Sequence, residues 1–307
     1  MVQVQPPSSD GVQLSLDELI FFKQHVIHWL APAKSLWSQM HGHHRSHQLG
    51  RGMDFSEVRQ YQAGDDIRSI DWRVTARTGK PHTKLFTEER EKPVIVYIDL
   101  SSSMQFGSKF MLKSVLVAHM ASLVSWLAIA QKDRIGAVID NGQELIELKP
   151  TSRASGPLQI MQKVIDVHHK MLQDLRQASG QGSGMLHALS ALSRLCPKGS
   201  EVILLSDFTR FQPDHVSRLS QLRRHNQLKF IQIIDPLEQG DTSYRGAELV
   251  SNRRKSQWID FSSRRSRQHL KQAFESHQQS IKSICNEHAI RYASLSSGTP
   301  LLQQLSV

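Results

Sequence analysis

The stretch VIVYIDLSSSMQFG, residues 94–107, begins as an apolar run and ends in a carboxylate and several hydroxyls. Its first half is typical of a buried strand. Asp99, Ser101 and Ser103 follow at two-residue spacing, so in an extended loop their side chains point the same way. The residues alone leave three interpretations open: a metal site, a nucleophile, or serines that cap the next helix.

The chain beyond residue 94 alternates strand-like and helix-like segments. The spacing predicts strands at 94–99, 134–140, 144–149, 201–207, 228–235 and 289–295. It predicts helices at about 109–131, 155–176, 185–195, 213–225 and 263–287. Residues 242–260 have the composition of a further β excursion. This alternation predicts an α/β fold with a doubly wound, mostly parallel sheet and helices on both of its faces.

Composition narrows the class of protein. The chain has 307 residues, of which 39% are hydrophobic, enough for a core. Cys196 and Cys285 lie far apart, which excludes a disulfide framework and a C-x-x-C zinc site and suits a reducing compartment. No signal-peptide pattern is visible at the start. We therefore expect a cytoplasmic protein.

One apolar segment, FMLKSVLVAHMASLVSWLAIA at 110–130, is long enough to span a membrane. Lys113 and His119 interrupt it, which favours a buried amphipathic helix over a span. Without a transmembrane span, any membrane contact would be peripheral.

Asp99 and Asp207 each end a predicted strand. Ligands of parallel sheets bind at the carboxyl ends of the strands, so the two loops should meet at one edge. Carboxylates with hydroxyls suit a hard cation such as Mg²⁺. The spacing does not decide between a cation site and a helix cap.

The preceding block, GRGMDFSEVRQYQAGDDIRSIDWRVTARTGKPHTKLFTEERE at 50–91, is dense in Gly, Asp and Arg. Its alternating pieces FSEVRQY and HTKLFTEE predict short strands. For the charged run 64–73 we expect a structural network that ties this region to the sheet. The residues expected to pair in it are Asp65, Asp71, Arg68 and Arg73. A partner-docking surface or acid/base catalysis are the alternatives.

Two motifs resemble known families. The D-x-S-x-S run with a later strand-end aspartate resembles the metal-ion-dependent adhesion site of von Willebrand factor A domains. The 50–91 block, with its core Arg59–Arg73, resembles the signature of the domain-of-unknown-function family number fifty-eight. In that family the block precedes a von Willebrand A-type domain. The resemblance covers roughly residues 48–210.

The resemblance implies three parts: an N-terminal helical and polar segment 1–47, a small β-containing block 48–92, and a von Willebrand A-like domain 93–307. It also implies a set of metal ligands for Mg²⁺ or Mn²⁺: Asp99, Ser101, Ser103 and Asp207. Gly184 stands where the family pattern has a threonine, so one hydroxyl ligand is missing. The adjacent Ser183 is a possible auxiliary ligand.

The function implied by the resemblance is a non-catalytic protein-interaction module. Relatives accompany MoxR-type AAA+ ATPases, so we expect an adaptor or chaperone partner of such an ATPase, with a partner carboxylate completing the metal site. The alternatives are a metal-assisted phosphoester hydrolase that uses Asp99, and a nucleic-acid binder.

Two further segments bear on binding. The formal net charge is +10, which favours anionic partners. The basic segment 253–271 carries Trp258 and Phe261, a pattern that would suit nucleic acid, although a solvated face or an acidic protein fits it better.

The histidine cluster 41–47 is a weak transition-metal pattern and is more typical of a solvated loop.

Overall fold

The computed structural model describes residues 5–26, 53–62, 64–88, 91–174, 184–240, 244–251 and 256–305. The chain divides into two compact units, one formed by Met1–Met40 with Lys92–Val307 and the other by His41–Glu91. The sequence-based division at residues 47/48 and 92/93 stays a prediction.

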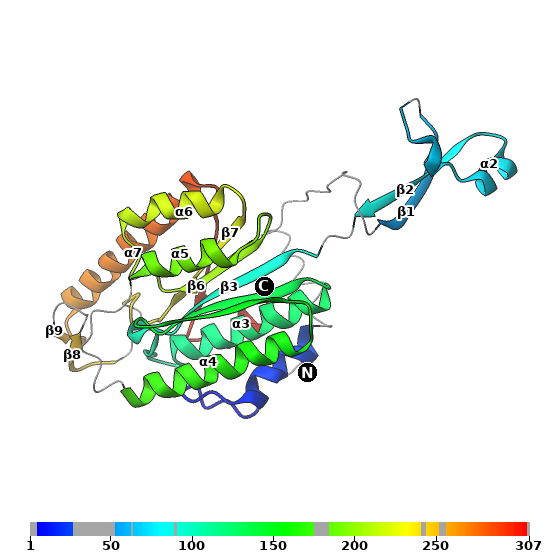
Figure 1. The fold of residues 1–307 in the computed structure, drawn as a ribbon. Coiled ribbons are helices and arrows are strands. Elements are labelled where there is room, and N and C mark those ends of the chain that lie inside the picture. The colour runs from blue at the N-terminus through cyan, green and yellow to red at the C-terminus, as the bar shows by residue number, and fades with distance from the viewer. Residues whose placement is uncertain are drawn as a thin grey trace. The chain divides into compact units, whose positions relative to one another are not determined.

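The large unit is built on one six-stranded sheet (Figure 1). Its strands, in spatial order, are β10 (Arg291–Ser296), β7 (Gln227–Ile234), β6 (Glu201–Ser206), β3 (Pro93–Asp99), β4 (Arg134–Asp140) and β5 (Leu145–Thr151). All neighbours pair in parallel except β4 and β5, which form an antiparallel hairpin. The Asn141-Gly142 turn joins them, with Gly142 at a φ of +88° that favours glycine. The predicted mostly parallel sheet is confirmed.

Helices cover both faces of this sheet (Figure 1). One face carries a helical stretch at 16–26 together with α3 (Lys113–Ala130), α4 (Ser155–Asp174) and α8 (Leu301–Leu305). The other carries α5 (Met185–Leu195), α6 (Val216–Arg223) and α7 (Arg264–Glu287). Short 3₁₀ turns are η1 (Ile67–Ser69), η2 (Ser102–Met104) and η3 (Pro213–His215), and a hairpin of β8 (Ala247–Ser251) and β9 (Ser256–Asp260) precedes α7.

Strand β3 shows how the sequence builds two cores. Val96 and Ile98 belong to the cluster under α3 and α4, whereas Ile95 and Tyr97 belong to the cluster under α5, α6 and α7. The alternation follows from the two-residue period of a strand. Because both faces are covered, nearly every residue of the strand is apolar, as expected for a parallel sheet.

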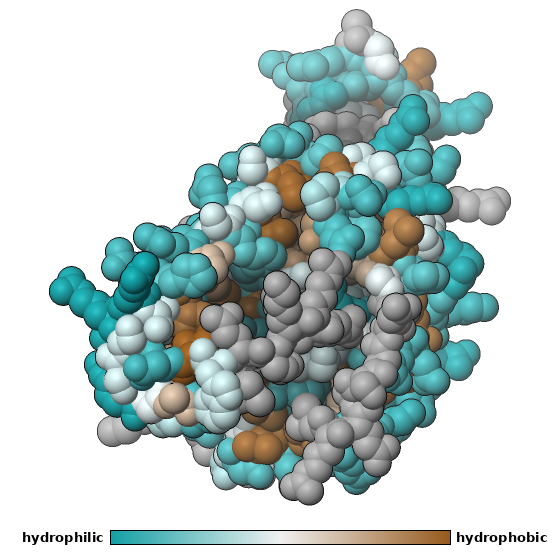
Figure 2. Space-filling view, turned by 90° about the vertical axis from the view of Figure 1, so that its left-hand side faces the viewer, coloured by the Kyte–Doolittle hydropathy of each residue, from teal (hydrophilic) through white to brown (hydrophobic). Residues whose placement is uncertain are grey.

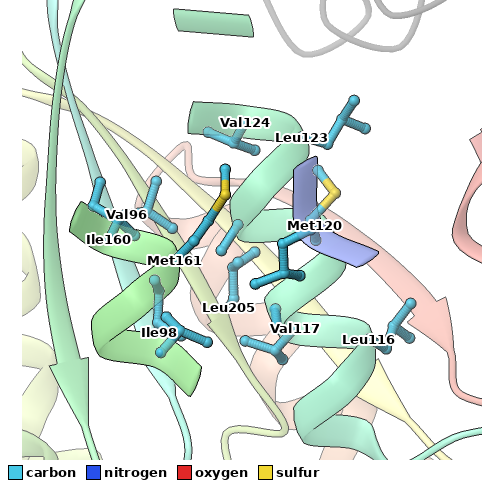
Figure 3. Close-up of a cluster of buried hydrophobic side chains, with 14 of the residues drawn as sticks. Val96, Ile98, Leu116, Val117, Met120, Leu123, Val124, Ile160, Met161 and Leu205 are labelled. Atoms are coloured by element: carbon cyan, nitrogen blue, oxygen red, sulfur yellow. The ribbon is translucent and has the colours of Figure 1, made fainter. Parts of the chain in front are cut away.

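Helix α3 differs from its prediction in two ways. It begins at Lys113 rather than near residue 109, and Lys113 to Ala128 are all buried, so the helix is not amphipathic. Figure 3 shows the reason: Val117 lies on the side of α3 that faces Leu205 of the sheet, and Met120 lies on another side, beside the N-terminal helical stretch. Leu19 and Phe22 of the N-terminal stretch belong to the same cluster. A helix covered on all sides has apolar side chains on every side, and its few polar side chains need partners.

The buried hydroxyl, imidazole and ammonium groups of α3 are hydrogen-bonded, whereas the buried indole N–H of Trp126 has no hydrogen-bond partner among the described residues. Nε2 of His119 lies 2.7 Å from Oε1 of Glu18, and both side chains are shielded from solvent. Ser122 donates to the carbonyl oxygen of Leu19 at 2.6 Å. These contacts attach the N-terminal stretch to the core helix. Such pairing is required because an unpartnered buried polar group is costly.

The small unit is an antiparallel hairpin of β1 (Met53–Gln60) and β2 (His82–Glu88), with η1 and α2 (Trp72–Thr78) in its connection. The two strands were predicted and α2 was not. Asp71 caps α2 by accepting the backbone N–H groups of Arg73 and Val74. Asp66 caps η1 through the N–H of Arg68.

The prediction that Asp65 and Asp71 pair with Arg68 and Arg73 is therefore wrong. Arg68 and Arg73 contact these carboxylates through their backbones, not their guanidinium groups. Among the described residues of this unit, the two aspartates form ion pairs with other partners: Asp65 with Arg59 at 2.7 Å and Asp71 with Lys84 at 3.4 Å. Turn and cap geometry accounts for the aspartates together with these two ion pairs.

Leu205→Ala is expected to lower the free energy of unfolding by about 2–5 kcal/mol, because Leu205 is fully buried between sheet and helices. Leu158→Ala removes the same atoms from a side chain that is 39% exposed and should change it by less than about 0.5 kcal/mol. Denaturant unfolding of both variants measures the difference. Equal losses would contradict the packing described.

Glu18→Gln is expected to lower the unfolding free energy near neutral pH by about 1–3 kcal/mol. Burial raises the pKa of Glu18, but the hydrogen bond and charge of His119 outweigh it, so the folded pKa lies below the usual 4.5. A carboxyl group with a lowered pKa in the folded chain stabilises the folded state above pH 4.5. This stabilisation is lost as the pH falls through the folded pKa.

The difference between wild type and Glu18→Gln should therefore shrink on acidification below pH 4.5. Denaturant unfolding across a pH series measures it. The exposed neighbour Asp17, changed to Asn, is the control and should leave the profile unaltered. A pH-independent difference would show that the charge of Glu18 contributes nothing.

Candidate functional site

The carboxyl ends of the parallel strands bring several acidic residues to one edge. In the strand register Asp99 lies opposite Asp140, and Ile98 lies opposite Leu205, which places Ser206 and Asp207 beside Asp99. The chain leaves β3 toward β4 on one side and returns as β6 on the other, so this point is a topological switch point of the sheet. Ligands of open α/β sheets bind at such points.

Figure 2 looks onto the side toward which the carboxyl ends point in Figure 1. It shows mostly hydrophilic side chains with separate hydrophobic patches among them. The acidic residues themselves lie beneath this surface, since Asp99 and Asp140 are fully buried and Asp207 is almost so.

Arg210 is the centre of the first group of contacts. Its Nη2 donates to Oδ1 of Asp99, to Oδ2 of Asp140 and to the hydroxyl of Tyr97, each at 2.8 Å. Tyr97 donates in turn to Asp140 at 2.7 Å. The other oxygen of Asp99 accepts from Ser206 at 2.6 Å. One guanidinium thus holds two neighbouring strand ends together.

Lys113 is the centre of the second group. Its Nζ lies 3.0 Å from Oδ2 of Asp207 and 2.5 Å from Oε1 of Glu238. Oδ1 of Asp207 accepts both the backbone N–H and the hydroxyl of Thr209, at 3.0 and 2.8 Å. The first residue of α3 therefore bonds to the loops after β6 and β7.

The structure brings the predicted ligands together. Ser101 donates its backbone N–H to Asp99 at 3.0 Å, and its hydroxyl lies 3.4 Å from that of Ser103. Thr209 bonds to Ser103 at 3.4 Å and so connects the serines to Asp207. The grouping of these residues was predicted correctly, but whether they bind a metal stays a prediction.

The helix-capping interpretation fails. Ser101 precedes η2 without a side-chain cap bond, and α3 begins after Leu112 rather than after a serine. Gly184 precedes α5, and a Cβ there would meet nothing closer than 4.0 Å, so space does not demand a glycine. Ser183 lies outside the described residues.

Charge and burial explain the protonation behaviour of the group. Burial raises the pKa of Asp99, and nearby carboxylates raise it further against the lowering effect of Arg210. Burial would also raise the pKa of Asp207, but the Lys113 ammonium outweighs it and holds the pKa at about 2. The pKa values of Arg210 and Lys113 are raised, because their carboxylate partners outweigh desolvation. Both cations therefore stay charged.

These contacts do not fit an open divalent-cation site. Every carboxylate oxygen of Asp99 and Asp207 already accepts a hydrogen bond, and two side-chain cations sit against them. Within the described ranges, no group of three or more His, Cys, Asp or Glu is arranged to hold a metal. The histidine cluster 41–47 lies outside those ranges.

Three residues of this group were not predicted from the sequence: Arg210, Lys113 and Asp140. Asp140 ends the strand RIGAVID just as Asp99 ends VIVYID, so the same pattern could have identified it. Lys113 was noticed only as an interruption of an apolar run; a lysine there, in a helix that packs on the sheet, was a signal for a buried partner. Arg210 has no local pattern that would single it out.

The basic segment 253–271 was expected to present two aromatic rings. Trp258 is 68% exposed, whereas Phe261 is buried and cannot stack on a base. Residues 252–255 lie outside the described part of the chain.

Comparison with protein families shows to which family the chain belongs. The model described as "Protein of unknown function DUF58" matches residues 57–280. The chain belongs to this family. The resemblance found in the 50–91 block is thereby confirmed, and the family's function is unknown.

Relatives of this DUF58 chain include uncharacterized proteins of Mycobacterium bovis and Mycobacterium tuberculosis, each 29% identical over 202 residues. The match covers 64% of this chain and 60% of each relative. The chain thus spans less than two thirds of the length of the curated relatives it matches.

Similar solved structures include BatB from Bacteroides thetaiotaomicron, at 14% identity and a TM-score of 0.43, covering 70% of this chain and 95% of that one. An aerotolerance-related membrane protein from Bacteroides fragilis has 10% identity and a TM-score of 0.43, covering 70% and 96%. The SpRpn10 VWA domain has 10% identity and a TM-score of 0.32, covering 70% and 94%. The strand order and the helix layers support a von Willebrand A-like fold. The low TM-scores of these structures carry no argument about function.

The predicted cytoplasmic location is not supported. Similar structures include the aerotolerance-related membrane protein and a protein from Vibrio fischeri described as membrane spanning, and these descriptions belong to those proteins. Among the residues that the structure describes, one helix, α3, is long and apolar enough to cross a membrane, and 89% of it is buried in the molecule. Such burial is expected of a core helix.

Arg210→Ala is expected to lower the free energy of unfolding by about 3–5 kcal/mol, because it leaves Asp99 and Asp140 buried without their cation. Arg218→Ala, on the exposed side of α6, is the matched control and should cost less than about 0.5 kcal/mol. Denaturant unfolding measures both. Similar values for the two variants would mean that Arg210 does not hold the strand ends.

Proposed function

We propose that this DUF58 chain is a non-catalytic protein-interaction module that docks a partner at the carboxyl edge of its sheet. The observation that supports this most is the state of the strand-end carboxylates: Asp99, Asp140 and Asp207 are buried and hydrogen-bonded within the chain. They hold the strand ends at the switch point rigidly, and none of the three carboxylates is open to a substrate.

Exposed apolar side chains beside this edge suit a protein partner. Phe106, in the loop after β3, is 37% exposed, and Leu186, in the first turn of α5, is 42% exposed. Both belong to segments that begin or end at the carboxyl edge. Large apolar side chains on loops are common anchors of protein interfaces.

For the partner we propose a MoxR-type AAA+ ATPase, which the family resemblance implies. The net charge of +10 supports an acidic docking face on that partner, because complementary charge speeds encounter and excludes wrong partners. In this role the chain would act as an adaptor between the ATPase and its target.

The hydrolase alternative has no support in the geometry. A nucleophilic Asp99 would need an approach to substrate, yet the side chain has no exposed surface and both its oxygens are engaged. Nucleic-acid binding through 253–271 is weakened in the same way, because Phe261 is buried.

Phe106→Asp is expected to weaken binding to a MoxR-type ATPase of the same organism by roughly tenfold, about 1.4 kcal/mol, because it places a charge where an apolar side chain would be covered. Titration calorimetry or a pull-down with the purified ATPase measures it. Leu158→Asp, equally exposed on α4, is the matched control and should bind as the wild type does.

If the wild type shows no binding, the proposed partner is wrong. If both variants bind normally, the docking face lies elsewhere on the chain.

A further inference from the structure

The family resemblance implies a cation between the two acidic loops, and the structure already places cations there. Nη2 of Arg210 lies 2.8 Å from an oxygen of Asp99, and Nζ of Lys113 lies 3.0 Å from an oxygen of Asp207. A magnesium ion binds carboxylate oxygens at about 2.0–2.1 Å and needs near-octahedral room. An ion on these oxygens would have to displace the two side chains.

Displacing Arg210 and Lys113 from their carboxylate partners would cost much free energy, because both side chains are buried. The side chain of Arg210 is 8% exposed and that of Lys113 is 1% exposed. Neither can reach water without moving the loops around it. Removing its carboxylate partner would leave a buried charge uncompensated, which costs several kcal/mol.

The remaining oxygens of the group are also satisfied from within the chain. Asp99 accepts from Ser206 and from the backbone of Ser101, and Asp207 accepts twice from Thr209. Asp140 accepts from Tyr97 and from the backbone of Gly142. Two cations offset half of the four formal negative charges of this group, and these hydrogen bonds stabilise the rest. The acidic residues of the group are Asp99, Asp140, Asp207 and Glu238.

We propose that Arg210 and Lys113 are the built-in cations of this edge, so that the chain docks its protein partner without a divalent metal ion. The inference rests on the proposed interaction function and changes its mechanism. A carboxylate of the partner cannot complete a metal site here, because the positive charges are covalently attached and buried. Recognition instead falls to exposed side chains beside the edge, such as Phe106 and Thr209.

The direct test is Mn²⁺ titration of the full chain, followed by the electron paramagnetic resonance signal of free Mn²⁺. Asp99→Asn is measured beside the wild type. We expect no saturable binding that depends on Asp99, and the same unfolding temperature in Mg²⁺ and in EDTA. Mn²⁺ that binds equally to Asp99→Asn sits elsewhere and agrees with the proposal. One-site binding that disappears in Asp99→Asn overturns it.

Arg210→Gln gives the converse measurement, because it uncovers oxygens of Asp99 and Asp140. Where circular dichroism shows that this variant folds, it should acquire Mn²⁺ binding that the wild type lacks. Binding by the wild type that exceeds that of Arg210→Gln would overturn the proposal. If the variant does not fold, the wild-type titration decides alone.

Partner capture separates this inference from the proposed function. Nucleotide-free ATPase is used in both arms, so that EDTA acts on this chain rather than on bound nucleotide. Capture that is equal in Mg²⁺ and EDTA supports both proposals. Capture abolished by EDTA and restored by Mg²⁺ overturns metal independence but keeps the interaction. Absence of capture in both arms refutes the partner, and the Mn²⁺ titration still decides the metal question.

Discussion

The contact on which the carboxyl edge depends is the bridge from Arg210 to Asp99 and Asp140. Parallel strands in register place these two carboxylates side by side in a buried row, where like charges repel strongly in a poorly polarisable surrounding. The guanidinium offsets this repulsion and also holds the loop after β6 against β3 and β4. Lys113 does the same for the loops after β6 and β7. The conformation of the whole edge follows from these two cations.

Much of the fold could be predicted because the sequence pattern of an element matches its surroundings in the folded chain. β3, β4 and α5 lie within a residue of their predicted bounds. The spacing of apolar residues indicates a strand or helix reliably where the same side of the element is buried along its whole length. α3 was misjudged for the opposite reason. The N-terminal stretch covers the side that an ordinary surface helix shows to water, and nothing within 110–130 reveals a segment some hundred residues earlier.

The residues of the candidate site likewise fall into those that the sequence predicts and those that it does not. Asp99, Ser101, Ser103 and Asp207 could be grouped from sequence, because strand ends of a parallel sheet meet at one edge. Their cations could not, because Arg210 is 111 positions from Asp99 and Lys113 is 94 positions from Asp207. A motif records which acidic side chains converge, but the charge that balances them is set by the tertiary fold.

The same physics bears on what the D-x-S-x-S run does in this chain. Asp99 orders the loop through the backbone N–H of Ser101. The hydroxyls of Ser101 and Ser103 lie in contact, and Ser103 also contacts Thr209. Each position therefore has a structural role that needs no bound ion. A metal ion would make the edge respond to the surrounding cation concentration, whereas a guanidinium and an ammonium fixed to the chain make it constant.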